Sequence, residues 1–468
     1  MFYVAFLIFV LSLLVKLHTI DAFVTYNSET AQHYLEIVSL QEGKILLQGP
    51  LTSKPWLRLS SAPYYLFYPL LYMTSFHPAA LHYLWVLTSC ATVLISYSVV
   101  SSLYGKQAGV IASWLYFTSA NILSVDRNTG FFPFIIPLSY ILIWQTGQVF
   151  FRDSKKQWAL FFTISCMFTL HASGIVLLPF YTGALLLSKK YNLRQALASV
   201  FAFLLPQTPL LLNELSTNFS SLANLALWVP YKVVSFVSGK TLGVGGSTVV
   251  DQTVEILIEF LKNTVFPSSA PTALGIGIFI LLLLSFVALL KKRAYTLDLY
   301  LMALLLFGIT ALLIHKNPPQ HYFVPFMVVP LVLAARFFDI LFTHKSYRIM
   351  SVLSLFVLSV VNSKSIFSPE YMFALPTSTL QQQESVASLI YTDIKNSEYQ
   401  LYRIGDFDNY PKRFQENYEF LLWRLGNRPR SSSKSIYYIV ENEKGPPIDT
   451  PVESIGSVNT ISIYKNLR

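Results

Sequence analysis

Residues 273–293 read ALGIGIFILLLLSFVALLKKR, a run of eighteen almost wholly apolar residues followed at once by three basic ones. A helix needs about 20 mostly apolar residues to cross a bilayer. Basic residues gather in the short loops on the cytoplasmic side of membrane proteins. The stretch therefore predicts a membrane-spanning helix that ends on the cytoplasmic side at Lys291.

The composition of the whole chain agrees with this stretch. Of the 468 residues, 53% are hydrophobic and only 12% are charged, whereas soluble domains carry about 25% charged residues. The mean hydropathy is +0.50. These values indicate a multi-pass membrane protein and exclude a soluble enzyme, a disordered scaffold and a nucleic-acid-binding protein. The net charge of +10 follows from the placement of basic residues relative to the membrane.

Apolar runs of this kind recur along the chain and predict a mainly α-helical bundle of about eleven spans. The predicted spans are Phe2–Leu17, Ala80–Leu103, Ala108–Leu123, Phe131–Phe151, Trp158–Leu170, Gly174–Leu187, Ala196–Leu212, Ala273–Leu290, Leu299–Ile314, Phe323–Phe337 and Ile349–Val361. The first run lacks a preceding basic residue and a small-residue cleavage site, which favours a retained helix over a signal peptide.

The charges in alternate connections predict the orientation. Only Arg127 and Lys316 lie in the short connections on one side. The short connections on the other side hold twelve basic residues: Lys106, Arg152, Lys155, Lys156, Lys189, Lys190, Arg194, Lys291, Lys292, Arg293, Lys345 and Arg348. The second side is therefore predicted to be cytoplasmic, with the N-terminus inside and the C-terminus outside a plasma or inner membrane.

This orientation places every long connection outside. We expect a transmembrane domain over residues 1–361, with external loops 19–78 and 213–272, and an external α/β domain over residues 362–468, called the tail below. In the loops, helices are predicted over 29–41 and 250–265 and an interfacial segment over 62–74. Tail helices are predicted over 384–396 and 414–425. IYYIVEN (436–442) and ISIYKN (461–466) are typical of strands. GKTLGVGGST (239–248) lacks the Walker spacing, which favours a hinge or lid over a phosphate-binding loop.

Ionisable residues are almost absent from the centres of the spans, which argues against ion-coupled transport. Polar residues gather instead in four external connections. An acid there can act as a general base while basic groups neutralise a leaving phosphate. The candidates are Asp21, Glu29 and Glu36; Asp126, Arg127 and Asn128; His171; and His315, Lys316, Gln320, His321 and Tyr322.

The order of these motifs resembles that of the GT-C superfamily. These integral-membrane glycosyltransferases use polyprenyl-phosphate-linked sugars at external active sites, and include the protein O-mannosyltransferases of family 39 and lipid A aminoarabinose transferase. In them an Asp-Glu pair follows the first span, then a helix ending in Gly and a Pro-Tyr-Tyr-rich segment. NSETAQHYLEIVSLQEGKILLQGP (27–50) and SSAPYYLFYPLLY (60–72) have that layout. Glu29 stands at the position of the pair's Glu, fourteen residues before Gly43, and Ser28 replaces the Asp.

Three further stretches extend the resemblance over roughly residues 1–345. They are DRNTGFFPFIIPL (126–138), LHASGIVLLP (170–179) and PPQHYFVPFMVVPLVLAA (318–335). The resemblance implies transfer of a hexose or pentose, with inversion, from a polyprenyl-phosphate carrier to a lipid, glycan or protein acceptor on the periplasmic or luminal face. It implies Glu29 as the catalytic base, with Asp126 and Asp21 as further catalytic candidates. It also implies donor-phosphate binding by Arg127, His171, Lys316, His321 and Tyr322.

Each candidate also fits a structural role. Glu29 suits the first turn of a helix, Arg127 suits a lipid-headgroup anchor, and Asp126 suits an ion pair with Arg127. His171 fits a hydrogen-bonded turn, and His321 and Tyr322 fit membrane-interface anchors. No ligand spacing indicates a metal site, and the need for a divalent cation is left open. Two other functions stay open: a transporter or flippase of lipid-linked substrates, and a non-catalytic subunit of a membrane assembly.

Overall fold

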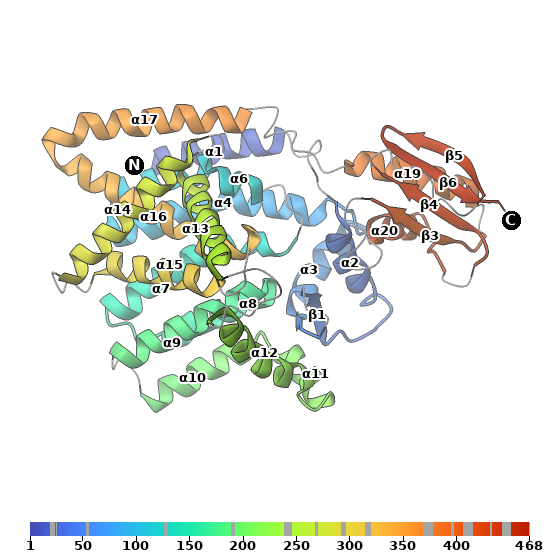
Figure 1. Ribbon diagram of the computed structural model, residues 1–468, viewed down its shortest axis with the longest axis horizontal. Coiled ribbons are helices and arrows are strands. Elements are labelled where there is room, and N and C mark those ends of the chain that lie inside the picture. Colours follow the sequence, from blue (N-terminus) through green and yellow to red (C-terminus); the bar gives the residue numbers. More distant parts are fainter. Residues whose placement is uncertain are drawn as a thin grey trace.

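The structure is a computed structural model. It describes residues 1–18, 24, 26–52, 56–125, 130–188, 192–237, 246–266, 270–291, 296–313, 320–367, 378–394, 397–405, 415–430, 433–441 and 451–467. Within these residues the protein has a large helical bundle and a small sheet-containing tail, and the first external loop lies between them (Figure 1).

The bundle comprises helices joined by short connections. Its elements are α1 (Phe2–His18), α4 (Ala80–Tyr104), α5 (Lys106–Thr118), α6 (Ala120–Val125), η1 (Phe132–Phe134), α7 (Ile135–Thr146), η2 (Gly147–Phe151), α8 (Gln157–Leu170), η3 (Ala172–Val176), α9 (Leu177–Ser188), α10 (Leu193–Leu204), α11 (Thr208–Ser216), α12 (Ser220–Val237), α13 (Gly246–Val265), α14 (Thr272–Lys291), α15 (Leu297–Leu313), η4 (Gln320–Phe326), α16 (Val328–Thr343) and α17 (Lys345–Phe367).

Three helices among the described residues are long and apolar enough to cross a membrane, namely Ala80–Tyr104, Phe132–Phe151 and Lys345–Ser363. Five shorter apolar helices of 10–17 residues accompany them. Large apolar side chains such as Tyr3, Leu284 and Phe356 are more than half exposed. Such faces suit contact with lipid, which is as apolar as the side chains themselves. The number of eleven spans stays a prediction.

The structure breaks several runs that the sequence analysis treats as single helices. The predicted span Ala196–Leu212 divides into α10 and α11, which meet at an angle of 79°. Pro206 lies in this bend and Pro209 in the first turn of α11, and proline cannot donate the backbone hydrogen bond that a continuous helix needs. The predicted span Ala108–Leu123 is interrupted at Ser119, whose backbone is extended. Helix α12 lies in a loop where no helix was predicted.

The loop over residues 19–78, predicted to be external, and the tail contain the helices that were predicted in them and also strands that were not. The loop contains α2 (Ser28–Val38), the short antiparallel pair β1 (Gln48–Leu51) and β2 (Arg58–Ser60), and α3 (Ala62–Met73). The tail contains α19 (Leu380–Ile394), β3 (Gln400–Ile404), α20 (Glu416–Arg424), β4 (Ile436–Val440), β5 (Val452–Val458) and β6 (Ile461–Asn466). Its sheet has the order β3-β4-β6-β5. Strands β3 and β4 are parallel, and the other neighbouring pairs are antiparallel.

The loop and the tail share one hydrophobic core. Tyr26, Tyr34 and Phe67 from the loop side belong to the same buried cluster as Ile390 and Phe420 from the tail. The Tyr34 and Phe420 rings meet edge to face with centroids 5.1 Å apart. Helix α2 is thus held between α3 and α20, and this packing fixes the helix that begins with the candidate base.

Candidate functional site

Glu29 lies in the first turn of α2. Asn27 caps this helix, because its side-chain oxygen accepts a hydrogen bond from the backbone N–H of Thr30 at 2.9 Å. A carboxylate in a first turn is favoured by the helix dipole. The Glu29 side chain is accessible to solvent, yet protein surrounds it closely, and the resulting loss of solvation raises the pKa of its carboxyl. Among the described residues Glu29 has no ion-pair partner.

A buried polar network supports the same helix one turn further on. The Tyr64 hydroxyl donates to the Glu36 carboxylate, and Arg58 Nη1 donates to the other oxygen of that carboxylate at 2.9 Å. His33 Nδ1 lies 3.1 Å from the Tyr64 oxygen. Because the Tyr64 proton is directed at Glu36, His33 Nδ1 must be the donor in this contact. Burial, with a smaller effect of Arg58, lowers the pKa of His33 to about 3, so the ring is neutral.

Two adjacent phenylalanines join α2 to the middle of the chain. Phe131 stacks on His33, with ring centroids 4.8 Å apart, and on Phe67 at 5.2 Å. Phe132 contacts His321 at 5.5 Å and His171 at 6.1 Å. Two consecutive residues at the start of η1, the N-cap Phe131 and Phe132, thus contact two groups that are far apart in the sequence. The first external loop and two later connections therefore meet at this point.

His171, His321 and Tyr322 form, with Phe132, a group that we call the histidine cluster. The ring centroid of His171 lies 5.2 Å from that of His321 and 5.2 Å from that of Tyr322. His171 precedes η3, and its Nδ1 accepts from the Ser173 backbone N–H at 3.2 Å. The proton of the neutral ring therefore lies on Nε2, which can donate to an oxygen. Burial, with a smaller effect of His321, lowers the pKa of His171 to about 3.

The structure thus brings together part of the predicted site. His171, His321 and Tyr322 are in mutual contact, whereas Glu29 lies one helical turn before His33, whose ring stacks on Phe131. Asp21, Asp126, Arg127 and Lys316 lie outside the described residues. No group of three or more His, Cys, Asp or Glu that could hold a metal ion occurs within the described part of the chain.

Sequence reasoning missed the network behind α2. His33 and Glu36 follow Glu29 at spacings of four and seven residues, which places them on the same side of a helix. That spacing was the available signal for His33. Nothing in the sequence indicated that Tyr64 and Arg58 would complete the network.

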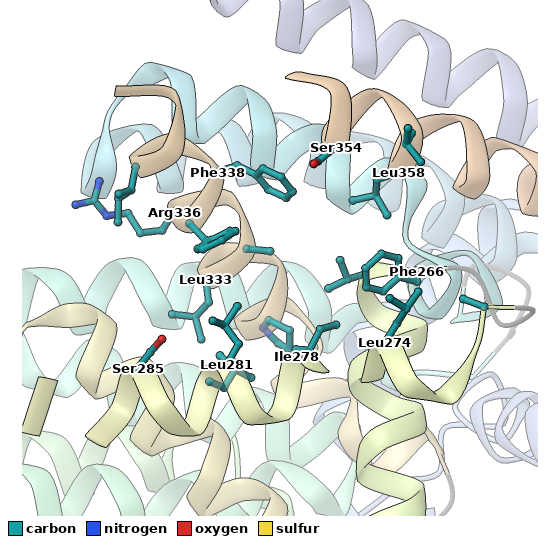
Figure 2. A pocket seen from close by; sticks show the side chains of 18 of the residues that line it. Phe266, Leu274, Ile278, Leu281, Ser285, Leu333, Arg336, Phe338, Ser354 and Leu358 are labelled. Atoms are coloured by element: carbon teal, nitrogen blue, oxygen red, sulfur yellow. The ribbon is translucent and has the colours of Figure 1, made fainter. Parts of the chain in front are cut away.

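A large apolar cavity lies among α13, α14, α16 and α17. Phe260 of α13 stacks on Phe323 of η4, with centroids 4.8 Å apart. Val265, at the end of α13, and Pro330 of α16 line the cavity, which has a volume of about 1110 Å³. Figure 2 shows Phe266, Leu274, Ile278 and Leu281 at its wall, with Arg336 at the opposite side from Phe266. Asp339 pairs with Arg336 at 3.0 Å. A chain of isoprene units would find an apolar surface here.

Comparison with known proteins identifies the fold. No protein-family model and no curated protein sequence matches the chain. Solved structures do match. ArnT from Cupriavidus metallidurans bound to undecaprenyl phosphate has a TM-score of 0.58 and 9% identity, covering 98% of this chain and 97% of its own. The apo state of that protein has a TM-score of 0.60, 10% identity and the same coverage.

The Archaeoglobus fulgidus oligosaccharyltransferase complexed with Zn and sulfate has a TM-score of 0.51 and 13% identity, covering 92% of this chain and 67% of its own. Both relatives are GT-C glycosyltransferases. The predicted resemblance to this superfamily is therefore confirmed at the level of the fold, which is that of multi-pass membrane proteins.

Proposed function

We propose that the chain is a membrane glycosyltransferase that moves a sugar from a polyprenyl-phosphate carrier to an acceptor on the outer face of the membrane. The observation that carries this proposal is the junction at Phe131 and Phe132. There His33, on the helix of the candidate base, stacks on Phe131, and the next residue, Phe132, contacts His321 of the histidine cluster. The bundle also holds an apolar cavity suited to a lipid tail. The GT-C fold adds support, since one relative was solved with undecaprenyl phosphate bound.

In the proposed reaction Glu29 acts as a general base. Its carboxylate takes the proton of the acceptor nucleophile, the acceptor atom forms a bond to the anomeric carbon, and the bond from that carbon to the phosphate oxygen breaks. The carrier phosphate leaves with the electron pair. One acid suffices for such a direct displacement, which inverts the anomeric centre. Asp21 and Asp126 are the alternatives for the role of base.

The leaving phosphate requires neutralisation by nearby donors. His171 offers its Nε2–H in the neutral state, and Tyr322 offers a hydroxyl beside it. His321 belongs to the same cluster, and Arg127 and Lys316 would bring full positive charges. Hydrogen bonds that are already in place where charge develops can lower the barrier considerably. A bound phosphate would also favour a proton on His171, because an opposite charge stabilises the imidazolium.

The deciding experiment incubates the purified protein in liposomes with a radiolabelled polyprenyl-phosphate sugar and a mixture of envelope acceptors. Transfer of the label with release of polyprenyl phosphate supports the proposal. Movement of intact carrier lipid between leaflets without release indicates a flippase. If the folded protein gives neither result, and the Glu29→Gln variant cannot be distinguished from wild type, the chain is a non-catalytic subunit.

A further inference from the structure

Four buried polar residues connect the first turn of α2 to the tail. Tyr26 and Ser28 flank the helix cap, while Gln383 belongs to α19 and Asn417 to α20. All four are at most 7% exposed. We call this set the polar chain. Its two loop residues and its two tail residues are more than 350 positions apart in the sequence, and hydrophobic packing of Tyr34 against Phe420 lies beside it.

The hydrogen bonds of the polar chain run in one direction. Gln383 Nε2 donates to the Tyr26 carbonyl at 3.0 Å and to Ser378 Oγ at 3.0 Å. Asn417 Nδ2 donates to Gln383 Oε1 at 3.1 Å. The Ser28 hydroxyl donates to Asn417 Oδ1 at 3.1 Å. In these bonds each side-chain N–H of Gln383 or Asn417 donates to an oxygen.

Two acceptors fix this direction. The Tyr26 carbonyl can only accept a hydrogen bond. Ser378 donates its own proton to Glu441 Oε1 at 3.4 Å, and Glu441 is held by Arg403 and by the Tyr418 hydroxyl at 2.6 Å. Gln383 must therefore direct its nitrogen to Tyr26 and Ser378 and its oxygen to Asn417. Asn417 in turn must direct its oxygen to residue 28.

Residue 28 consequently has to be a donor. Glu416 also lies beside Ser28, and burial raises the pKa of its carboxyl. One oxygen of Glu416 is buried and has no hydrogen-bond partner within the described residues. A carboxylate at position 28 has no proton to donate, and it would face two acceptors, Asn417 Oδ1 and the Glu416 carboxylate. This explains why serine stands here, where the GT-C pair has an acid.

From this arrangement we infer that the polar chain is a positioning device for Glu29, with Asn417 and Gln383 as its key members. The inference rests on the proposed function. The polar chain holds Tyr26 and Ser28 on either side of the capping residue Asn27, and Glu29 directly follows Ser28. A general base must reach the acceptor proton within hydrogen-bond distance, and a displacement of about 1 Å can cost about 10²-fold in rate.

The test combines two measurements on the full-length protein in detergent. Hydrogen exchange measured by mass spectrometry reports on the amides at the start of α2, and initial rates report on transfer. In Ser28→Ala and Asn417→Ala we expect several-fold faster exchange over residues 28–32. We also expect a fall in kcat of about 10-fold or more, with KM for the carrier lipid within twofold of wild type. The kcat of the double variant should be no lower than that of Asn417→Ala, because both substitutions break the same polar chain.

Two variants serve as controls. Ser28→Thr keeps the donor and should retain wild-type exchange and kcat. Asp393→Ala removes the ion pair between Asp393 and Lys465, whose charged atoms are 2.7 Å apart, at the other end of α19. This variant should leave hydrogen exchange in α2 unchanged. Unchanged exchange in Asn417→Ala, or an equal loss of kcat in Asp393→Ala, would overturn the inference. If the wild-type protein transfers no sugar, the proposed function fails, and the exchange data alone then decide whether the polar chain orders α2.

Discussion

Glu29 is the residue on which the proposed chemistry depends most. Its glutamine variant keeps the size of the side chain but cannot accept a proton. We expect turnover in Glu29→Gln to fall by about 10²–10⁴-fold, the usual contribution of a general base, while the carrier lipid still binds. Asp21→Asn should be milder. Initial rates and lipid-binding titrations measure both effects. Near-normal turnover in Glu29→Gln together with loss of turnover in Asp126→Asn would assign the role of base to Asp126.

The pH dependence of the proposed transfer follows from the environment of the same carboxyl. Poor solvation raises the pKa of Glu29, and the proposed reaction needs its ionised form. We therefore expect kcat/KM to fall as the pH is lowered through a value above the ordinary 4.5 of a glutamate. A pH–rate profile between pH 4 and 8 tests this prediction, and a rate that stays level down to pH 4.5 would contradict it.

Arg127 tests the phosphate side of the proposed site. The planar guanidinium can bind a phosphate through two parallel hydrogen bonds, which a lysine ammonium cannot reproduce. We expect Arg127→Lys to bind the carrier-linked sugar about 10-fold more weakly, the loss of roughly one charge-assisted hydrogen bond. Equilibrium binding to labelled donor measures this. Unchanged affinity would identify Arg127 as an anchor for lipid headgroups.

His33 makes the stability of the protein sensitive to acid. Its pKa is lowered from 6.5 to about 3 in the folded protein, so below pH 6.5 the unfolded chain binds a proton that the folded chain does not. Stability is therefore full above pH 6.5 and falls as the pH is lowered, by up to about 1.4 kcal/mol per pH unit. His33→Asn keeps a donor for Tyr64 and does not titrate. Its melting temperature should drop less between pH 7 and pH 5, and parallel curves would contradict the assignment.

At the scale of single elements, η3, which directly follows His171, packs closely against α8. A Cβ added at Gly174 would lie 2.6 Å from the Phe168 backbone nitrogen, whereas a Cβ at Gly183 of α9 would meet nothing within 4 Å. Gly174→Ala should destabilise the protein by about 1–3 kcal/mol and weaken donor binding, because the backbone beside His171 must move. Gly183→Ala, the matched control, should be neutral or stabilising by up to about 1 kcal/mol. Thermal melts and donor titrations distinguish the two; equal effects would exclude the steric argument.

The elements also show what the sequence could and could not predict. Helix α2 was predicted within a few residues, because its cap and its apolar spacing are local signals. The bend after α10 was missed although Pro206 was visible, since apolarity alone does not distinguish a continuous span from two short helices. Strand β3 was missed because QLYRI is short and only one of its residues is fully buried. Its pairing with β4 depends on contacts distant in sequence.

The candidate site, like the helices and strands, was predicted from the sequence only in part. His171, His321 and Tyr322 were named from the connections in which they lie, and their contact confirms that those connections meet. The roles of all the site residues remain proposals. Gln383 and Asn417 carry no local signal of function, because each acts through a partner supplied by another part of the fold.

At the scale of the whole molecule, the orientation in the membrane is the prediction on which the rest depends. We expect a cysteine at Ser432 in the tail to react with a membrane-impermeant maleimide in intact cells. A cysteine at Lys155, in a connection predicted to be cytoplasmic, should react only after permeabilisation. Mass-tag gel shifts measure both. The reverse pattern would place the proposed site on the cytoplasmic side and contradict the positive-inside argument.

The hydrogen bond between Ser28 and Asn417 joins residues that are 389 positions apart, and this separation has a consequence for biosynthesis. A ribosome completes the segment around Asn417 long after the helix of Glu29 has left the translocon. Contacts of such long range form late in folding. A nascent or truncated chain would therefore hold the helical bundle without the bonds that order the start of α2. Under the proposed function, such a chain would leave its sugar donors unconsumed until the tail had been made.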